Sequence, residues 1–296
     1  MAIILSESRN PYFNLALEEY LLKNDILEED IALFWQSEKA FVFGRNQNPF
    51  VEINPSFFNR NIPIIRRVSG GGTIYQDSHT LVFSFITKNY EKKINDYEYF
   101  LKPIIEVLKS KNLNVSFKPK SHLFIDDYKI SGNAQAFINN KLLHHGTLLI
   151  DTDLDIINEA LVDYSYITKG NHILSNKQKV ANLNQFLDKP CNTTDLVIDI
   201  IEKSVNLLGL NKKRYFLSDE DINKISNLMI AKYNTWEWNF GKTKEFEMDM
   251  IIDGHKEKLV IDNGIVKAVS NIKLKFLIGI KFYSEEFFEK IKYVKK

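Results

Sequence analysis

The sequence predicts an α+β fold in which mixed β-sheets are flanked by helices and followed by a small α+β unit at the C-terminal end. Three observations support this prediction. Two segments carry apolar residues at helical spacing, short β-rich runs lie between them, and after about Asp151 the pattern is mainly helical until strands return near Lys244. This order is neither a βαβ repeat nor an all-β pattern, so a mixed architecture is expected.

Helices are expected where apolar residues recur three or four positions apart. Ser218 is a suitable helix cap, because the acidic residues Asp219 and Glu220 follow it in the first turn, where the helix dipole favours negative charge. The expected helices lie around Phe13 to Leu21 and Phe100 to Leu108, and over Thr194 to Leu208, Ser218 to Lys232 and Glu285 to Ile291.

Strands are expected where short β-rich runs are bounded by Gly, Pro and Asn. The Asp253-Gly254 and Asn263-Gly264 pairs are typical of two-residue hairpin turns. The expected strands are Ala32 to Gln36, Ala40 to Phe43, Ile64 to Arg66, Thr73 to Gln76, Leu81 to Thr87, Asn114 to Phe117, Leu123 to Ile125, Tyr128 to Ile130, Ala134 to Ile138, Lys141 to Ile150, Lys244 to Ile252, Lys256 to Ile261 and Ile265 to Ile272. We therefore divide the chain into residues 1–238 and a small accessory domain, residues 239–296.

Composition excludes several classes of protein. The 296 residues are 44% hydrophobic, enough to bury a sizeable core, and the net charge of +1 lacks the basic excess typical of nucleic-acid binding. No run approaches the roughly 18 apolar residues of a membrane span. The single Cys191 can form neither an internal disulfide nor a multi-cysteine metal site, so we expect a cytoplasmic protein, with a monomer as the default.

The strongest local signal is a triglycine turn between two expected strands. Successive glycines allow positive φ and close approach to a ligand, and their N–H groups can form an anion-binding nest. Arg66 and Arg67 add fixed positive charge suited to carboxylate or phosphate. The alternative is a glycine-rich hairpin with two solvated arginines; the spacing fits neither a Walker A loop nor a Rossmann turn. The segment reads Arg66-Arg67-Val68-Ser69-Gly70-Gly71-Gly72-Thr73-Ile74-Tyr75-Gln76-Asp77.

Two further segments carry polar residues on expected strands. Lys129 follows a turn with two acids, and strand alternation points its side chain away from those of Tyr128 and Ile130; alone, it reads as a surface lysine. His144 and His145 should face opposite sides of their strand, which argues against a shared metal. One of them is a candidate to line a pocket. The segments read Asp126-Asp127-Tyr128-Lys129-Ile130-Ser131-Gly132-Asn133-Ala134-Gln135 and His144-His145-Gly146-Thr147-Leu148-Leu149.

Together these ordered motifs resemble the lipoate-protein ligase A family of the biotin/lipoate ligase superfamily. The resemblance runs almost continuously from Asn10 to Gly241 and more weakly to about Ile272. Further matching stretches are Asn10-Pro11-Tyr12-Phe13-Asn14-Leu15-Ala16-Leu17-Glu18-Glu19-Tyr20, Gly44-Arg45-Asn46-Gln47-Asn48, Lys169-Gly170, Lys179-Val180-Ala181-Asn182-Leu183 and Trp236-Glu237-Trp238-Asn239-Phe240-Gly241. The last of these is typical of the ligase subgroup.

The resemblance implies an enzyme that uses ATP, with Mg²⁺, to convert lipoate into lipoyl-AMP with release of pyrophosphate. It then implies transfer of the lipoyl group to a lysine of an acceptor protein. The implied acceptors are lipoyl domains of 2-oxoacid dehydrogenase complexes and the H protein of glycine cleavage. Nucleic acid and membrane are not expected partners.

The resemblance also implies roles for individual residues. Lys129 is the implied catalytic residue, bridging the acyl carbonyl and the phosphate, and no side chain is assigned as a metal ligand. The residues implied for ATP or the adenylate are Arg67, Gly72, Thr73, Ile74, Tyr75 and Lys129. Those implied for lipoate are Ser69, Gly70, Gly71, Lys129, His145 and Gly146. Leu15, Phe43, Phe83 and Leu148 are candidates for the wall of a lipoyl tunnel or for core.

Some features depart from the family or have a simpler reading. Gln76 stands where the family commonly carries His, and an amide cannot serve as a base near neutral pH, so we assign it a positioning role. The accessory domain is also shorter than usual. Trp236 and Trp238 are expected to pack at the domain junction, with Glu237 and Asn239 in polar surroundings.

Three other functions stay open at this point. An ATP-independent octanoyl or lipoyl transferase of the same superfamily would use a cysteine acyl-enzyme, and Cys191 is the only cysteine available. A biotin-type ligase would carry a Gly-Arg-Gly-Arg loop, whereas this chain has Gly44-Arg45-Asn46. A non-catalytic cofactor-binding domain would be expected to lack Arg67 or Lys129, and both are present.

Overall fold

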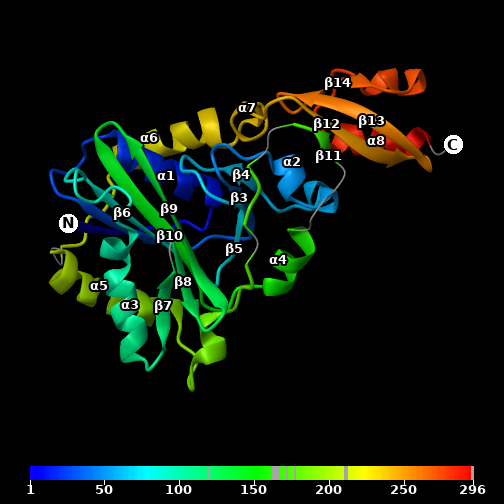
Figure 1. Ribbon diagram of the computed structural model, residues 1–296. Coiled ribbons are helices and arrows are strands. Elements are labelled where there is room, and N and C mark those ends of the chain that lie inside the picture. Colours follow the sequence, from blue (N-terminus) through cyan, green and yellow to red (C-terminus); the bar gives the residue numbers. More distant parts are fainter. Residues whose placement is uncertain (119–120, 162–166, 171–172, 177, 210–212, 295–296) are drawn as a thin grey trace.

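The computed structural model describes residues 1–118, 121–161, 167–170, 173–176, 178–209 and 213–294. Figure 1 shows a large body of sheets and helices, with a small sheet and a terminal helix beside it, and this confirms the predicted α+β architecture. Within the described ranges, no helix has both the length and the apolar character needed to cross a membrane.

A seven-stranded sheet forms the centre of the large body. Its first two strands are parallel and all other neighbours are antiparallel. In spatial order the strands are β1 (Ala2–Leu5), β2 (Ile31–Trp35), β6 (Thr80–Thr87), β10 (Lys141–Leu149), β9 (Tyr128–Ile138), β8 (His122–Ile125) and β7 (Val115–Lys118).

The two faces of this sheet carry different helices because strand side chains alternate in direction. Phe83 and Phe85 pack against α3 (Tyr97–Ser110) and α5 (Thr193–Leu208). Val82 and Ile86, one position away, belong to the opposite core. That second core is closed by α1 (Pro11–Lys23), α6 (Asp219–Leu228) and the short π-helix η3 (Met229–Tyr233).

A three-stranded sheet, with its own small core, holds the triglycine turn. Residues 67–73 connect two of its strands, so the turn is anchored at both ends. The strands are β4 (Ile64–Arg66), β3 (Ala40–Phe43) and β5 (Ile74–Gln76), accompanied by α2 (Pro49–Glu52), η1 (Pro55–Asn59) and α4 (Leu154–Ala160).

The C-terminal unit is built around two hairpins. Both predicted turns are present, and all four of their residues have positive φ, as type I′ turns require. The elements are β11 (Ile167–Lys169), β12 (Phe246–Ile252), β13 (His255–Asp262), β14 (Ile265–Val269), η4 (Ile272–Leu277) and α8 (Glu285–Val294). Because β11 pairs with β12, and Phe50 of α2 enters the same core, chain from both sides of residue 238 contributes to this unit. The division at 238/239 stays a prediction.

Several elements differ from those expected. The apolar run at the N-terminus forms β1, which binds β2 in parallel and was not anticipated from so short a segment. β9 is one strand rather than two, because Gly132 pairs with Thr147 and continues the ladder. The short helices α2 and α4, η1, η2 (Leu183–Phe186) and β11 were also not foreseen. The alternating Trp236 and Trp238 lie in a helical turn, α7 (Trp236–Asn239).

A buried arginine, Arg66 of β4, joins α7 to the three-stranded sheet. Arg66 is 1% exposed and lies over the Phe43 ring. Its guanidinium donates to the backbone oxygens of Trp238 (3.0 Å), Asn239 (3.0 Å), Arg45 (2.6 Å) and Gln47 (2.9 Å). In return, Trp238 Nε1 donates to the Arg66 carbonyl at 2.7 Å. Asn239 is buried, and its side-chain oxygen accepts a hydrogen bond from the Arg66 N–H at 2.9 Å, so its surroundings are polar, as expected.

Arg66→Met should destabilise the protein by about 3 kcal/mol or more, because four carbonyls that receive charged hydrogen bonds would be left without a donor inside the protein. The free energy of unfolding in urea measures this effect. Arg45→Met removes an exposed guanidinium from the neighbouring turn and should change stability little. Equal stability of the two variants would contradict the role assigned to Arg66.

Candidate active site

The triglycine turn is held against the end of β3. Gly71 has a φ of +91°, which favours glycine, and a Cβ on Gly44 would overlap the Gly71 carbonyl oxygen. The Arg45 N–H donates to the Ser69 carbonyl at 2.8 Å. Close backbone approach therefore fixes the position of the turn.

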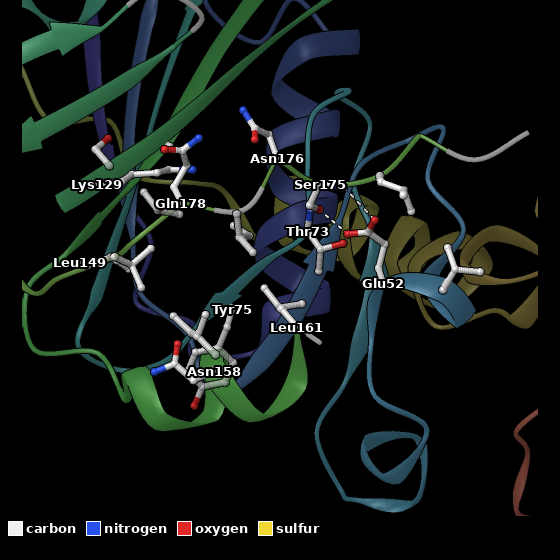
Figure 2. A pocket seen from close by; sticks show the side chains of 18 residues that line it. Glu52, Thr73, Tyr75, Lys129, Leu149, Asn158, Leu161, Ser175, Asn176 and Gln178 are labelled. Atoms are coloured by element: carbon white, nitrogen blue, oxygen red, sulfur yellow. Dashed lines mark hydrogen bonds between the residues drawn. The ribbon is translucent and has the colours of Figure 1, made fainter. Parts of the chain in front are cut away.

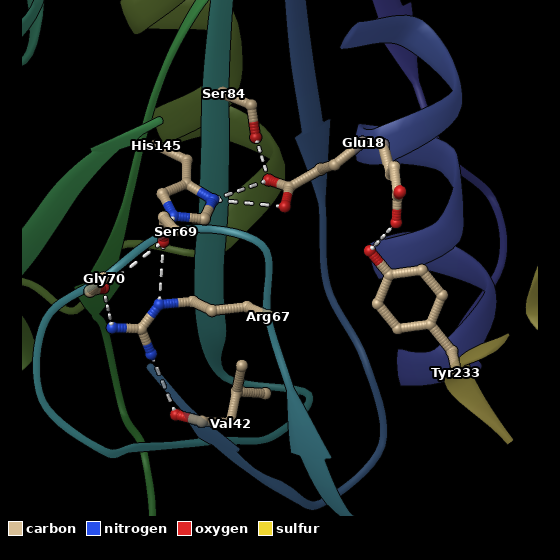
Figure 3. Close-up of polar contacts among 9 residues, drawn as sticks. Glu18, Val42, Arg67, Ser69, Gly70, Ser84, His145 and Tyr233 are labelled. Carbon is tan, nitrogen blue, oxygen red and sulfur yellow. Dashed lines mark hydrogen bonds and ion pairs between the residues drawn. The ribbon is translucent and has the colours of Figure 1, made fainter. Parts of the chain in front are cut away.

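The Arg67 guanidinium lies inside this turn (Figure 3). It donates to Ser69 Oγ at 2.9 Å and to the carbonyls of Gly70 and Gly72 at 2.6 and 2.9 Å. Burial lowers the pKa of Arg67 to about 10, opposed in part by Glu18, so the group is still a cation near neutral pH. The alternative of two solvated arginines is wrong, since Arg66 and Arg67 are both buried.

A chain of buried polar groups connects the turn to helix α1 (Figure 3). Ser69 Oγ lies 2.6 Å from His145 Nε2, and His145 Nδ1 lies 3.1 Å from both carboxylate oxygens of Glu18. Ser84 Oγ donates to the same carboxylate at 2.5 Å. Both ring nitrogens of His145 are therefore occupied, and the ring is fixed in orientation.

His144 faces the other way, as predicted. It is fully buried beside Phe100, with ring centroids 4.7 Å apart, and burial lowers its pKa well below the usual value. The two histidines do not share a site.

Lys129 is not a surface lysine. Its backbone N–H donates to Lys179 O at 2.8 Å, and its carbonyl accepts from Ala181 at 3.2 Å. Its side chain lies over Gly132, where a Cβ would be 3.0 Å from Nζ. Burial, and then the nearby Arg67, lower the pKa of Lys129 to about 8. Among the described residues no carboxylate forms an ion pair with Lys129 or Arg67. The positive charge of these two side chains is therefore available to an anionic ligand.

Two cavities of about 250 and 260 Å³ meet at Lys129. We call them the outer cavity and the inner cavity. Figure 2 shows Lys129 directed into the outer cavity, opposite Thr73, Ser175 and Glu52, with Tyr75, Asn158 and Leu161 along another wall. Residues lining both cavities are Thr73, Ile74, Lys129, Gly132, Thr147, Ser175 and Asn176.

The inner cavity lies on the α1 face of the central sheet. Strand pairing places Trp35, Val82, Thr147, Gly132 and His122 in one row across β2, β6, β10, β9 and β8, and all five line this cavity. The three strand spacings from Trp35 to Gly132 give a floor roughly 14 Å long. Leu15 and Val42 add apolar surface from α1 and β3. The inner cavity is thus elongated, mainly apolar around Trp35 and Val82 and cationic at Lys129.

Of the four residues that were candidates for the wall of a lipoyl tunnel or for core, one lines a cavity and three belong to the core. Leu15 lines the inner cavity, whereas Phe43, Phe83 and Leu148 line neither cavity and are fully buried in core. Phe83 and Leu148 point to the α3 and α5 face, because they alternate with the cavity-lining Val82 and Thr147.

Residues 173–176 cross over the triglycine turn. Ser175 Oγ accepts from the Thr73 N–H at 2.8 Å and from Gln47 Nε2 at 3.1 Å. Glu52 of α2 binds both the N–H, at 2.9 Å, and the hydroxyl of Ser175. The segment therefore closes one side of the outer cavity.

The structure brings most of the predicted site residues together. Arg67, Gly71, Gly72, His145 and Gly146 line the inner cavity, Tyr75 lines the outer cavity, and Thr73, Ile74 and Lys129 line both. Ser69 and Gly70 line neither; they hold Arg67 and His145 instead. Their role as lipoate contacts stays a prediction.

Other cavity residues were missed by the sequence analysis. Glu18 carried a signal, since it is an acid in an apolar stretch of helix α1, and it is 1% exposed. Gln76 was not missed: a positioning role was expected for it and stays a prediction. It lines the inner cavity and donates to Ser37 Oγ at 2.9 Å. Trp35, Glu52, His122, Asn133 and Ser175 gave no local signal, because only strand register and chain crossing bring them to the site.

Cys191 lies outside the site. It lines neither cavity and packs at the edge of the α3 and α5 core. Its Sγ lies 3.4 Å from Asn184 Oδ1, and burial raises its pKa. The chain's single thiol is thus neither activated nor near Lys129.

Known proteins resemble this chain in sequence and fold. The model of the lipoyl protein ligase A/B catalytic domain matches residues 10–205. Lipoate–protein ligase 1 of Staphylococcus aureus is 32% identical over 280 residues, covering 94% of this chain and 82% of that protein.

Two solved structures share the fold. One is an archaeal bipartite lipoate protein ligase, described with its E2 lipoyl domain, from Thermoplasma acidophilum. It has a TM-score of 0.69 at 21% identity and covers 80% of this chain and 95% of that chain. The other, lipoate-protein ligase A bound with ATP, has a TM-score of 0.68 at 20% identity and covers 80% and 97%.

Proposed function

Because this chain belongs to the lipoyl protein ligase A/B family, we propose that it is an ATP-dependent lipoate–protein ligase. It activates lipoate as lipoyl-AMP, releasing pyrophosphate, and transfers the lipoyl group to a lysine of an acceptor protein. The names of its relatives, lipoate–protein ligase 1 and an ATP-bound ligase A, support this activity.

The observation that carries the proposal is the meeting of the two cavities at Lys129. The inner cavity suits an extended acyl chain, with the carboxylate at the Lys129 end, and the outer cavity suits the nucleotide. Attack of a carboxylate on the α-phosphate of ATP brings two anions together, so cations and oriented donors are needed at that point. Lys129 and Arg67 supply positive charge there, and no carboxylate of the described residues forms an ion pair with either of them.

We propose the residue roles that the resemblance implies, and this arrangement supports them. Lys129 bridges the acyl carbonyl and the phosphate, and Arg67 with the turn residues Gly72 to Tyr75 holds ATP or the adenylate. Gly71, His145 and Gly146 contact the lipoyl group. Ser69 and Gly70 are assigned to lipoate as well, through the part of the turn that they shape.

Mg²⁺ is proposed to enter with the triphosphate. Among the described residues there is no group of three or more His, Cys, Asp or Glu side chains that could hold a metal, and the outer cavity's one carboxylate, Glu52, is bound to Ser175. The ion is therefore expected to be held mainly by ATP oxygens and water.

The proposed acceptors are lipoyl domains of 2-oxoacid dehydrogenase complexes and the glycine-cleavage H protein. Support comes from the Thermoplasma ligase, which is described with its E2 lipoyl domain. A monomeric state and a cytoplasmic location are proposed as well, the latter from the single cysteine.

One incubation tests the function. The full chain is mixed with ATP, Mg²⁺, lipoate and a purified lipoyl domain, and the mass of the acceptor is measured. We expect one lipoyl group to be added, and no addition when ATP or lipoate is omitted. Unmodified acceptor under the complete conditions, or modification without ATP, would contradict the proposal.

Cys191→Ser should leave ATP-dependent lipoylation near the wild-type rate, because the thiol lies outside both cavities. The assay compares initial rates of acceptor modification. A transferase that works through a cysteine acyl-enzyme would lose its activity in the same variant. Such a loss, with the fold intact, would favour the transferase alternative.

A further inference from the structure

His122 occupies a special place beside Lys129. It pairs with Gly132 in the β8–β9 ladder, so its side chain is on the same face as the inner cavity. A Cβ on Gly132 would lie 3.0 Å from Lys129 Nζ and 3.9 Å from His122 Nδ1. The two side chains therefore flank one spot, at the cationic end of the proposed acyl site.

The His122 ring is available for chemistry. Its Nδ1 is buried and has no hydrogen-bond partner of ordinary geometry among the described residues, although the residue as a whole is half-buried. Burial, and then the Lys129 ammonium, lower the pKa of His122 to about 4, and a contact with the Ser121 backbone opposes this shift. The ring is thus neutral near neutral pH, and one of its two nitrogens carries a lone pair that can accept a proton.

The other basic groups of the described cavity walls are already engaged. Glu18 and His145 bind each other, and His145 also binds Ser69. Glu52 binds Ser175 through both carboxylate oxygens. Lys129 must keep its proton to interact with an anion. His122 is the remaining proton acceptor at this end of the site.

We propose that His122 is the general base of the transfer step, accepting a proton from the acceptor lysine as that amine attacks the acyl-adenylate. This inference rests on the proposed ligase function and adds a catalytic residue to it. A bound adenylate phosphate brings negative charge beside the ring, which favours its protonated form and improves it as a base.

The proton balance of the two steps supports this assignment. A carboxylate is already ionised at neutral pH, so adenylation requires no base. In transfer, the acceptor ammonium, with a pKa of about 10.4 in water, first releases one proton to solvent. Its lone pair forms the bond to the acyl carbon, and AMP leaves with the electron pair of the broken carbon–oxygen bond. The nitrogen gives its surplus proton to His122, which passes it to water.

The test measures the two steps separately in the same preparations. Lipoate-dependent exchange of pyrophosphate into ATP reports adenylation, and single-turnover modification of a lipoyl domain by preformed lipoyl-AMP reports transfer. For His122→Gln we expect transfer to fall by roughly 100-fold or more, the usual contribution of a general base, with most of the exchange retained. Added imidazole should restore part of the transfer by His122→Ala.

His255→Gln, on the exposed end of the β13 hairpin, is the matched control and should keep both steps. Retained exchange also shows that the His122 variants are folded. Wild-type transfer by His122→Gln, or a parallel loss of exchange and transfer, would overturn the assignment of a base. If the wild-type chain itself shows no lipoate-dependent exchange, the proposed function fails instead, independently of His122.

Discussion

Lys129→Ala should abolish lipoate-dependent exchange of pyrophosphate into ATP, with a loss of roughly 10²- to 10³-fold or more. The ammonium lies where the two cavities meet, and the described residues offer no other cation that can reach the same spot over Gly132. Without the ammonium, the negative charge that develops when the carboxylate attacks the phosphate loses one preorganised cation that stabilises it. Exchange kinetics at saturating ATP and lipoate measure the effect.

The same variant should fold at least as stably as the wild type. Because burial lowers the pKa of Lys129 to about 8, the charged form opposes folding below that pH, where the lysine is protonated in both states. Neutral pH lies in this range, so the Tm of Lys129→Ala there should equal or exceed that of the wild type. The difference should shrink as the pH rises above 8 toward the ordinary pKa of a lysine. Lys118→Ala, on strand β7 two strands away from β9, is the control. Full exchange by Lys129→Ala would refute the role of this residue.

Gly44→Ala is expected to disturb both stability and ATP binding. The added Cβ would overlap the Gly71 carbonyl oxygen and lie 3.1 Å from the Gly71 carbonyl carbon, and these backbone atoms cannot rotate away. The turn must therefore shift, at a cost of about 1–3 kcal/mol of unfolding free energy. Because the turn carries the proposed phosphate donors, KM for ATP should rise as well.

Gly70→Ala is the matched control for stability in the same turn. A Cβ there meets no atom within 4 Å, and Gly70 does not have positive φ. Its unfolding free energy should stay near the wild-type value. If Gly44→Ala were as stable as Gly70→Ala and bound ATP normally, the close approach of residues 44 and 71 would not matter for the site.

The sequence predicted those parts of the fold that depend on local pattern. Helices α1, α3 and α5 carry regular apolar spacing, and the Asp253-Gly254 and Asn263-Gly264 turns demand positive φ. The parallel pairing of β1 with β2 and the π-helix at η3 depend on distant contacts. For example, the Glu19 carboxylate accepts hydrogen bonds from Lys232 Nζ at 2.5 Å and from the Tyr233 hydroxyl at 2.7 Å. Both donors lie in η3, and no local sequence pattern predicts these contacts.

The site was predicted to the extent that its residues belong to recognisable motifs. Arg67, Lys129 and the triglycine turn are local in sequence, and the structure brings them together. His122 and Trp35 are brought to the inner cavity by strand register, which the sequence does not specify across five strands. Ser175 arrives through a chain crossing. The burial of Arg66 also escaped prediction, because its partners are backbone carbonyls 19 or more residues away, in α7 and in the turn of Arg45 and Gln47.

The environment of Arg66 has a consequence for the behaviour of the protein in acid and in salt. Its charge is balanced by carbonyl dipoles, and burial lowers its pKa only to about 10, so neither the arginine nor its partners titrate as the medium is acidified. Dipoles buried in the protein are also poorly screened by dissolved ions. The hydrogen bonds of Arg66 between the three-stranded sheet and α7 should therefore persist in mild acid and in concentrated salt, where exposed ion pairs such as Lys224 and Glu220 weaken.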